Sequence, residues 1–236
     1  MKTHLLSYTH HDTPLEAFVA YPLKKIKLHP LIILCHAWNG RNDFICNKAL
    51  ELANLGFIAF ALDMYGKGII GKSKEENAAL KQPFIANREF LQKRVMAGYE
   101  VALNLAGIDQ KKIGVVGFGF GGLCALDLAC SGVDLQSLVS IYGHSDLAPP
   151  HLIQPIKSKI LILHGAKDPI VPISEVEQFQ RYLTEHNVDW QTHLFGNAAH
   201  AFTTPGSNDG KAGIIYDEKS AMRAWKLTCG FLEQLY

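Results

Sequence analysis

The sequence lacks several features that define whole classes of protein. No continuous apolar run flanked by positive charge stands near its start, so neither a secretory leader nor a membrane-spanning helix is expected. Its 23 basic and 22 acidic side chains give a formal net charge of +1. Without basic blocks, binding of nucleic acid or anionic lipid is not expected. We therefore expect a cytoplasmic protein whose partner is a small molecule.

Cysteine pairs and metal-binding patterns are also missing. The five cysteines include no CxxC pair, and several fall within apolar runs. Reduced, mostly buried thiols fit this pattern better than a disulfide framework. The eleven histidines show no pair spaced for a metal on one helix face, so a metal site is not expected.

What is present is an ordinary globular composition, with 48% hydrophobic and 19% charged residues. A chain of 236 residues can bury roughly 70% of its unfolded surface, enough for one large core. Strand and helix patterns alternate without a linker. We predict one domain over 1–236, as a monomer or homodimer.

Short apolar runs alternate with helical patterns along the chain, and this order predicts an α/β fold. Continuous apolar runs are typical of strands buried on both faces of a parallel sheet. Such a sheet lies between helices, and its ligand crevice lies beyond the carboxyl ends of the strands. The predicted strands are 15–21 (outer and antiparallel), 31–34, 57–62, 113–116, 138–142, 160–164 and 191–195. The predicted helices are 43–54, 84–106, 121–130, 174–187 and 219–235.

Residues 64–83 have weak periodicity, three glycines and many charges. This composition predicts a loop. Both a flap near the crevice and a surface loop without function fit it.

A glycine-rich turn follows the run 113–116. A strand, a sharp glycine-flanked turn and a helix form the frame of the nucleophile elbow G-x-Nu-x-G. Gly119 stands at the nucleophile position and has no side chain that could attack a substrate. The same glycines match the dinucleotide pattern G-x-G-x-x-G. Two strand–helix segments precede this strand, and the next strand ends without a ribose-binding carboxylate, so the elbow is favoured.

Two further residues fit a hydrolytic pattern. Asp168 follows the run 160–164, where a carboxylate can orient a histidine, although an Asp before Pro also commonly starts a turn. His200 lies 32 residues later, after the last predicted strand. The order nucleophile, acid, histidine is that of α/β-hydrolases. Asp168 is therefore the candidate orienting acid, and His200 is the candidate base.

The first predicted parallel strand is followed by a loop that can supply an oxyanion-binding amide. In this architecture an amide of Ala37 or Trp38 joins the amide of Phe120 to form an oxyanion hole. Core packing and a substrate-facing wall are alternative roles for the Trp38 side chain.

Together these residues resemble the dienelactone hydrolase family of α/β-hydrolases. The resemblance covers essentially the whole chain and rests on ILCHAWNG, GFIAFALDMYGKG, IGVVGFGFGG, IYG, LILHGAKDPIVP and AAHAF, in family order. It implies a cysteine or serine nucleophile with an Asp and a His, and hydrolysis of small esters or lactones without metal or organic cofactor. Asp168 and His200 match the family pattern directly.

Three positions depart from that pattern. Gly119 replaces the usual cysteine, which makes covalent catalysis at this position impossible. Ala37 stands where founding members carry a carboxylate that helps to control the cysteine. Thr203 and Thr204 stand where an arginine would bind a substrate carboxylate, so dienelactone itself is not the expected substrate. Candidate pocket residues are His36, Arg88, Arg94 and Phe202.

Three explanations for the absent nucleophile stay open. A water above Gly119 can be deprotonated by His200, and such general-base help contributes about 10²- to 10⁴-fold. A displaced thiol such as Cys35 is a second source, although packing is the commoner role there, and Cys124 is expected to be buried. The third explanation is an introduced glycine that disables the enzyme.

The leading interpretation is a hydrolase of a small carboxylic ester or lactone. The alternative is a non-catalytic binding or regulatory protein that keeps the crevice as a ligand pocket.

Overall fold

The computed structural model describes residues 1–24 and 26–236. The strands are β1 (Lys2–His10), β2 (Thr13–Tyr21), β3 (His29–Cys35), β4 (Ile58–Ala61), β5 (Ile108–Phe118), β6 (Ser137–Ile141), β7 (Lys159–Gly165), β8 (Trp190–Phe195), β9 (Asn208–Asp209) and β10 (Ile214–Ile215). The helices are α1 (Asp43–Asn54), α2 (Lys74–Ala86), α3 (Arg88–Ala102), α4 (Phe120–Cys130), α5 (Ile173–Glu185) and α6 (Glu218–Leu235), with a 3₁₀ turn at Pro150–Leu152.

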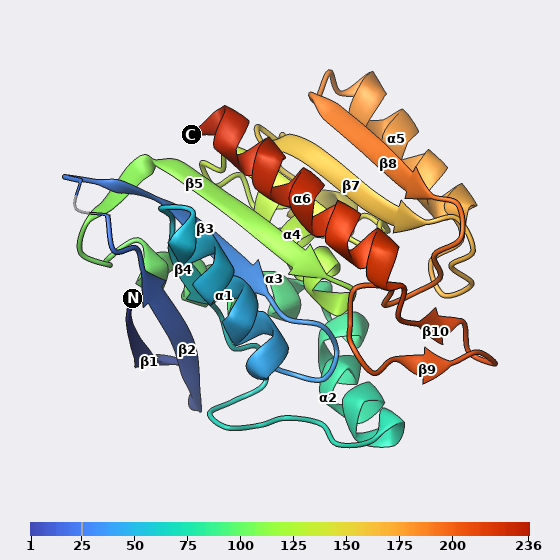
Figure 1. The fold of residues 1–236 in the computed structure, drawn as a ribbon, viewed down its shortest axis with the longest axis horizontal. Coiled ribbons are helices and arrows are strands. Elements are labelled where there is room, and N and C mark those ends of the chain that lie inside the picture. The colour runs from blue at the N-terminus through green and yellow to red at the C-terminus, as the bar shows by residue number, and fades with distance from the viewer. Residues whose placement is uncertain (25) are drawn as a thin grey trace.

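The described residues form one large sheet with the strand order β1-β2-β4-β3-β5-β6-β7-β8 (Figure 1). β1, β2 and β4 pair antiparallel, whereas neighbours from β4 to β8 pair parallel. The predicted mainly parallel sheet is therefore confirmed. β9 and β10 form a separate small hairpin.

Helices cover both faces of the sheet. α1 and α6 lie over the face nearer the viewer in Figure 1, where Ile32 and Leu34 of β3 join their apolar layer. α3, α4 and α5 cover the other face, where Leu31 and Ile33 pack. Successive strand side chains point to opposite faces, so a strand buried on both faces shows a continuous apolar run.

Three elements differ from the sequence prediction. Helix α2 occupies much of the predicted loop 64–83, and it begins where the Ser73 side chain accepts a hydrogen bond from the Glu76 amide. The predicted helix 84–106 is shorter because Asn87 ends α2 and caps α3. The outermost strand is β1 rather than 15–21. Most β1 side chains are exposed or half-exposed, so β1 has no apolar run that would predict it.

The parallel strands end at one edge of the sheet, and the arrowheads of β3, β5 and β7 point toward it in Figure 1. The loops that follow β3, β5, β6, β7 and β8 therefore gather there. The described helices include none that is long and apolar enough to cross a membrane.

Candidate active site

Gly119 occupies the sharp turn between β5 and α4. Its backbone has φ 53° and ψ −114°, a conformation that residues with side chains rarely adopt. Gly117 and Gly121 make the turn possible, because a Cβ at either would lie 2.1 Å from a backbone oxygen. The turn has the sharp shape expected of an elbow, and Gly119 places no side chain on it. We call the space where that side chain would stand the Gly119 seat.

His200 and Asp168 lie beside the Gly119 seat. Nδ1 of His200 is 2.8 Å from Oδ2 of Asp168, so Nδ1–H can donate to this carboxylate. In the neutral ring Nε2 then carries the lone pair. Nε2 lies 3.8 Å from the position that a Cβ on residue 119 would occupy. The structure thus brings together the three residues predicted as nucleophile position, acid and base.

Asp168 is held on both sides of its carboxylate. Oδ1 accepts hydrogen bonds from the amides of Ile170 and Val171, each at 2.9 Å, which leaves Oδ2 for His200. Burial acts to raise the pKa of Asp168, but the hydrogen bonds from His200 and Val171 outweigh it and lower the pKa. The ionised carboxylate can therefore stabilise a cation on His200.

Gly165, the last residue of β7, allows the loop that carries Asp168 to pack against the loop that carries His200. A Cβ on Gly165 would lie 2.6 Å from the carbonyl oxygen of Ala198 and 2.7 Å from that of Ala199. The amide of Lys167 donates to the carbonyl of Ala198 at 3.0 Å. The backbone that carries His200 therefore lies directly against the backbone that carries Asp168.

Tyr142 forms one wall of the Gly119 seat. Its ring packs edge-to-face on His200 with centroids 5.2 Å apart, and a Cβ on residue 119 would lie 3.2 Å from the ring. Its hydroxyl hydrogen-bonds with Thr204 at 3.0 Å and accepts one from Thr203 at 3.2 Å. Sequence reasoning missed this role, although Tyr142 directly follows a strand that ends at the crevice.

A cavity of about 90 Å³ adjoins Gly119 and His200. It is smaller than the 300–1,000 Å³ typical of drug-sized ligands. Ala37, Trp38 and Phe120 also line it, and the hydrogen bonds found among the described residues include none donated by their amides. These amides are therefore available to an oxyanion. The other polar side chains of the lining are Asn39, Lys81, His144, Thr204 and Ser207.

His36 and Phe202, predicted to lie in the pocket, are instead buried beside it. Nδ1 of His36 lies 2.7 Å from the carbonyl oxygen of Ala37, and Nε2 accepts from the Met64 amide at 3.2 Å. Burial lowers the pKa of His36, so its ring is neutral and both nitrogens are bonded within the protein. Phe202 is fully buried, with its ring packed against Tyr142. Neither side chain lines the cavity.

The two predicted pocket arginines also lie outside the cavity lining. Arg88, at the start of α3, bonds Asp127 with its Nε at 2.9 Å and pairs with Asp146 at 2.6 Å. Arg94 is buried and donates to the carbonyl of Met64 at 2.7 Å. The pocket prediction fails for both because partners distant in the sequence occupy their guanidinium groups.

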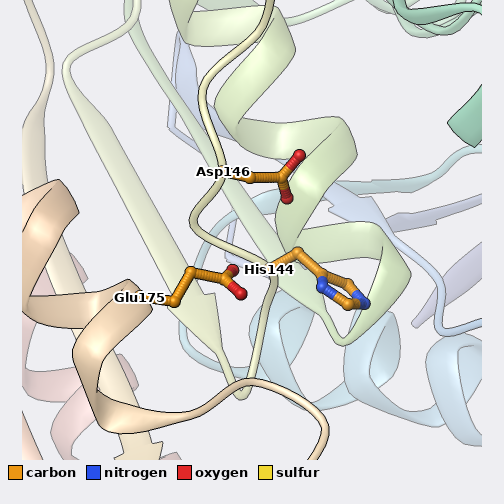
Figure 2. A group of neighbouring side chains, drawn as sticks. All are labelled: His144, Asp146 and Glu175. Atoms are coloured by element: carbon orange, nitrogen blue, oxygen red, sulfur yellow. The ribbon is translucent and has the colours of Figure 1, made fainter.

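His144 lines the cavity and belongs to a cluster with Asp146 and Glu175 (Figure 2). Their potential ligand atoms lie within 4.8 Å of one another. Burial lowers the pKa of His144 to about 4, so the ring is neutral. Asp146 pairs with Arg88, and Glu175 accepts the amide of Ser145 at 2.7 Å. Because both carboxylates already have partners, we assign the cluster to holding the loop after β6.

The cysteines considered as replacement nucleophiles lie outside the cavity lining. Cys35 and Cys124 are both fully buried, and burial raises the pKa of each thiol. The thiolate is the nucleophilic form, so neither side chain is suited to attack a substrate. All five cysteines are free.

Comparisons with known proteins identify the family of the chain. The dienelactone hydrolase family model matches residues 15–236. The uncharacterized protein K02A2.1 of Caenorhabditis elegans is 31% identical over 152 residues, covering 62% of this chain and 94% of that protein. A probable 2-oxo-3-(5-oxofuran-2-ylidene)propanoate lactonase of Bradyrhizobium sp is 25% identical over 207 residues, covering 79% and 78%.

Solved structures agree with the family match. The crystal structure of P91, described as a dienelactone hydrolase-like promiscuous phosphotriesterase from metagenomic libraries, has a TM-score of 0.94 to this chain. The two are 28% identical, and the match covers 99% of this chain and 98% of P91. The chain has the α/β-hydrolase fold that its sequence predicted, and it belongs to the dienelactone hydrolase family.

Proposed function

We propose that the protein hydrolyses a small carboxylic ester or lactone by direct attack of a water molecule. The observation that carries this proposal is the orientation of His200. Its Nδ1 bonds Asp168, while its Nε2 lies 3.8 Å from the Cβ position of the Gly119 seat. A water in that seat lies where a covalent nucleophile would otherwise stand.

The reaction then needs a single addition and a single elimination. Nε2 of His200 takes a proton from the water as its oxygen bonds to the acyl carbon. The amides of Phe120 and of Ala37 or Trp38 donate hydrogen bonds to the resulting oxyanion. Collapse of this intermediate breaks the bond to the leaving oxygen, which takes the proton from His200. No acyl-enzyme forms, so the rate lacks the advantage of covalent catalysis.

The cavity lining supports a small substrate that carries negative charge. Lys81 is half-buried, and its Nζ lies 5.7 Å from the centroid of the Trp38 ring. No carboxylate pairs with Lys81 among the described residues. Partial burial lowers the pKa of this ammonium group, because the charged form loses part of its hydration. An anionic group on the substrate would offset that loss.

One observation favours a second candidate, a non-catalytic ligand-binding protein. Gly119 removes the nucleophile while the cavity and its polar lining are retained. A protein of this kind would bind a small ester or acid without consuming it. A ligand that raises the melting temperature and is recovered unchanged would support it.

The first experiment measures hydrolysis of p-nitrophenyl acetate by the parent protein, His200→Ala and Gly119→Cys. We expect slow, steady hydrolysis by the parent and a loss of about 10²-fold or more in His200→Ala, because the general base is removed. We expect Gly119→Cys to release a burst of nitrophenol as an acyl-enzyme forms. Circular dichroism shows whether each variant is folded.

Equal rates for the parent and His200→Ala would contradict hydrolysis by His200-activated water. If Gly119→Cys alone were active, the scaffold would be competent, and the ligand-binding candidate would replace our proposal. A burst by the parent would show that a covalent nucleophile exists elsewhere in the chain.

A further inference from the structure

We propose that His164 is a positioning residue that fixes the Asp168 carboxylate toward His200. This inference rests on the roles proposed above for Asp168 and His200. His164 is the penultimate residue of β7, and its side chain is 1% exposed. It does not line the cavity and therefore cannot contact a bound substrate.

The hydrogen bonding of His164 fixes its tautomer. Nε2 lies 2.9 Å from the carbonyl oxygen of Val171, and a carbonyl oxygen only accepts, so Nε2 carries the proton. Burial lowers the pKa of His164, so the ring is neutral and Nδ1 carries a lone pair. Nδ1 has no hydrogen-bond partner among the described residues.

This hydrogen bond reaches the acid through one residue. The carbonyl of Val171 accepts from His164, while the amide of the same residue donates to Oδ1 of Asp168 at 2.9 Å. With Oδ1 occupied, Oδ2 is the oxygen that meets His200 at 2.8 Å. His164 thus anchors the turn 168–171 to its own strand, and the turn sets the direction of the carboxylate.

Packing alone does not account for a histidine at this position. A buried ring nitrogen without a partner is unfavourable, because it loses its hydrogen bond to water and gains none. Leucine or phenylalanine would fill the space without that loss. The donor at Nε2 is the property of His164 that an apolar residue cannot supply.

The test compares His164→Gln, His164→Asn and His164→Leu. Glutamine can place an N–H near the position of Nε2, asparagine places its N–H near Nδ1, and leucine has no donor. Two NMR readouts report on the acid directly: the low-field proton of the His200–Asp168 hydrogen bond and the ¹³C titration of the Asp168 carboxyl. We expect the parent signals in His164→Gln. In His164→Asn and His164→Leu we expect loss of the low-field proton and a rise in the pKa of Asp168.

These readouts do not require turnover, so a failure of the hydrolysis proposal would leave them unaffected. Parent-like signals in both His164→Leu and His164→Asn would overturn the positioning role and leave His164 as core packing. If His164→Leu does not fold, the comparison of His164→Gln with His164→Asn decides the question, because equal spectra for these two variants would overturn the proposal.

Discussion

At the residue scale, Gly165 shows how the backbone of one loop can set the geometry of another. The space beside its Cα is occupied by the carbonyl groups of Ala198 and Ala199, two and one residues before His200. The hydrogen bond between His200 and Asp168 therefore depends on a residue that contributes no side chain.

Replacing this glycine should separate the two loops. We expect Gly165→Ala to destabilise the fold by about 1–3 kcal/mol, because its Cβ overlaps carbonyl oxygens. We also expect a loss of any His200-dependent hydrolysis. Urea unfolding gives the stability change. The matched control is Gly196→Ala, because a Cβ on Gly196 would meet nothing within 4 Å. Equal midpoints for the two variants would contradict the close approach.

At the element scale, a buried ion pair joins α3 to α4. Asp127 in α4 is fully buried, and Arg88 at the start of α3 bonds it with two nitrogens. Burial raises the pKa of Asp127, although Arg88 opposes this rise. Arg88 also binds Asp146, so the same guanidinium ties both helices to the loop that carries His144.

Removing Arg88 alone should destabilise the protein more than removing both Arg88 and Asp127. We expect Arg88→Leu to destabilise the protein by about 3–5 kcal/mol, because the Asp127 carboxylate then stays buried without a cation. Adding Asp127→Leu should recover most of that loss. Urea unfolding of the two single variants and the double variant measures the coupling. Strictly additive losses would show that the pair is not coupled.

At the scale of the whole molecule, buried histidines make stability depend on pH. Burial lowers the pKa values of His36, His144 and His164 below 6.5, their usual value and the one expected in the unfolded chain. Below about pH 6.5 the unfolded state therefore binds more protons than the folded state, and the free energy of unfolding decreases as the pH is lowered. The lowered pKa of Asp168 acts in the same direction at lower pH, because its contribution is lost as pH falls through the folded value.

His144 allows this dependence to be measured. The contribution of His144 to the free energy of unfolding is lost between about pH 6.5 and about pH 4. Over this range the free energy changes by up to about 1.4 kcal/mol per pH unit. We expect His144→Gln to reduce the loss of stability between pH 7 and pH 4.5 relative to the parent, as measured by urea unfolding. Parallel curves for the two proteins would show that His144 titrates normally in the folded state.

The sequence allowed much of the fold to be predicted because the strands of a parallel sheet are buried on both faces. It also allowed Gly119, Asp168 and His200 to be selected, since each follows a predicted strand in the order of a known pattern. The prediction that Arg88 and Arg94 lie in the pocket was wrong, because the sequence does not show which distant groups a guanidinium will bond. Arg88, for example, bonds Asp127, which is 39 residues away. Strand β1 was missed because its side chains are largely exposed, and His164 because a histidine inside an apolar run is read as packing.

The backbone of Gly119 has a further consequence. A residue with a side chain pays roughly 1–3 kcal/mol to hold φ and ψ in such a sparsely populated region, whereas glycine adopts it freely. A cysteine or serine at an elbow thus reduces stability in exchange for reactivity. Gly119 avoids this loss of stability, and the same substitution removes the side chain that covalent catalysis would need.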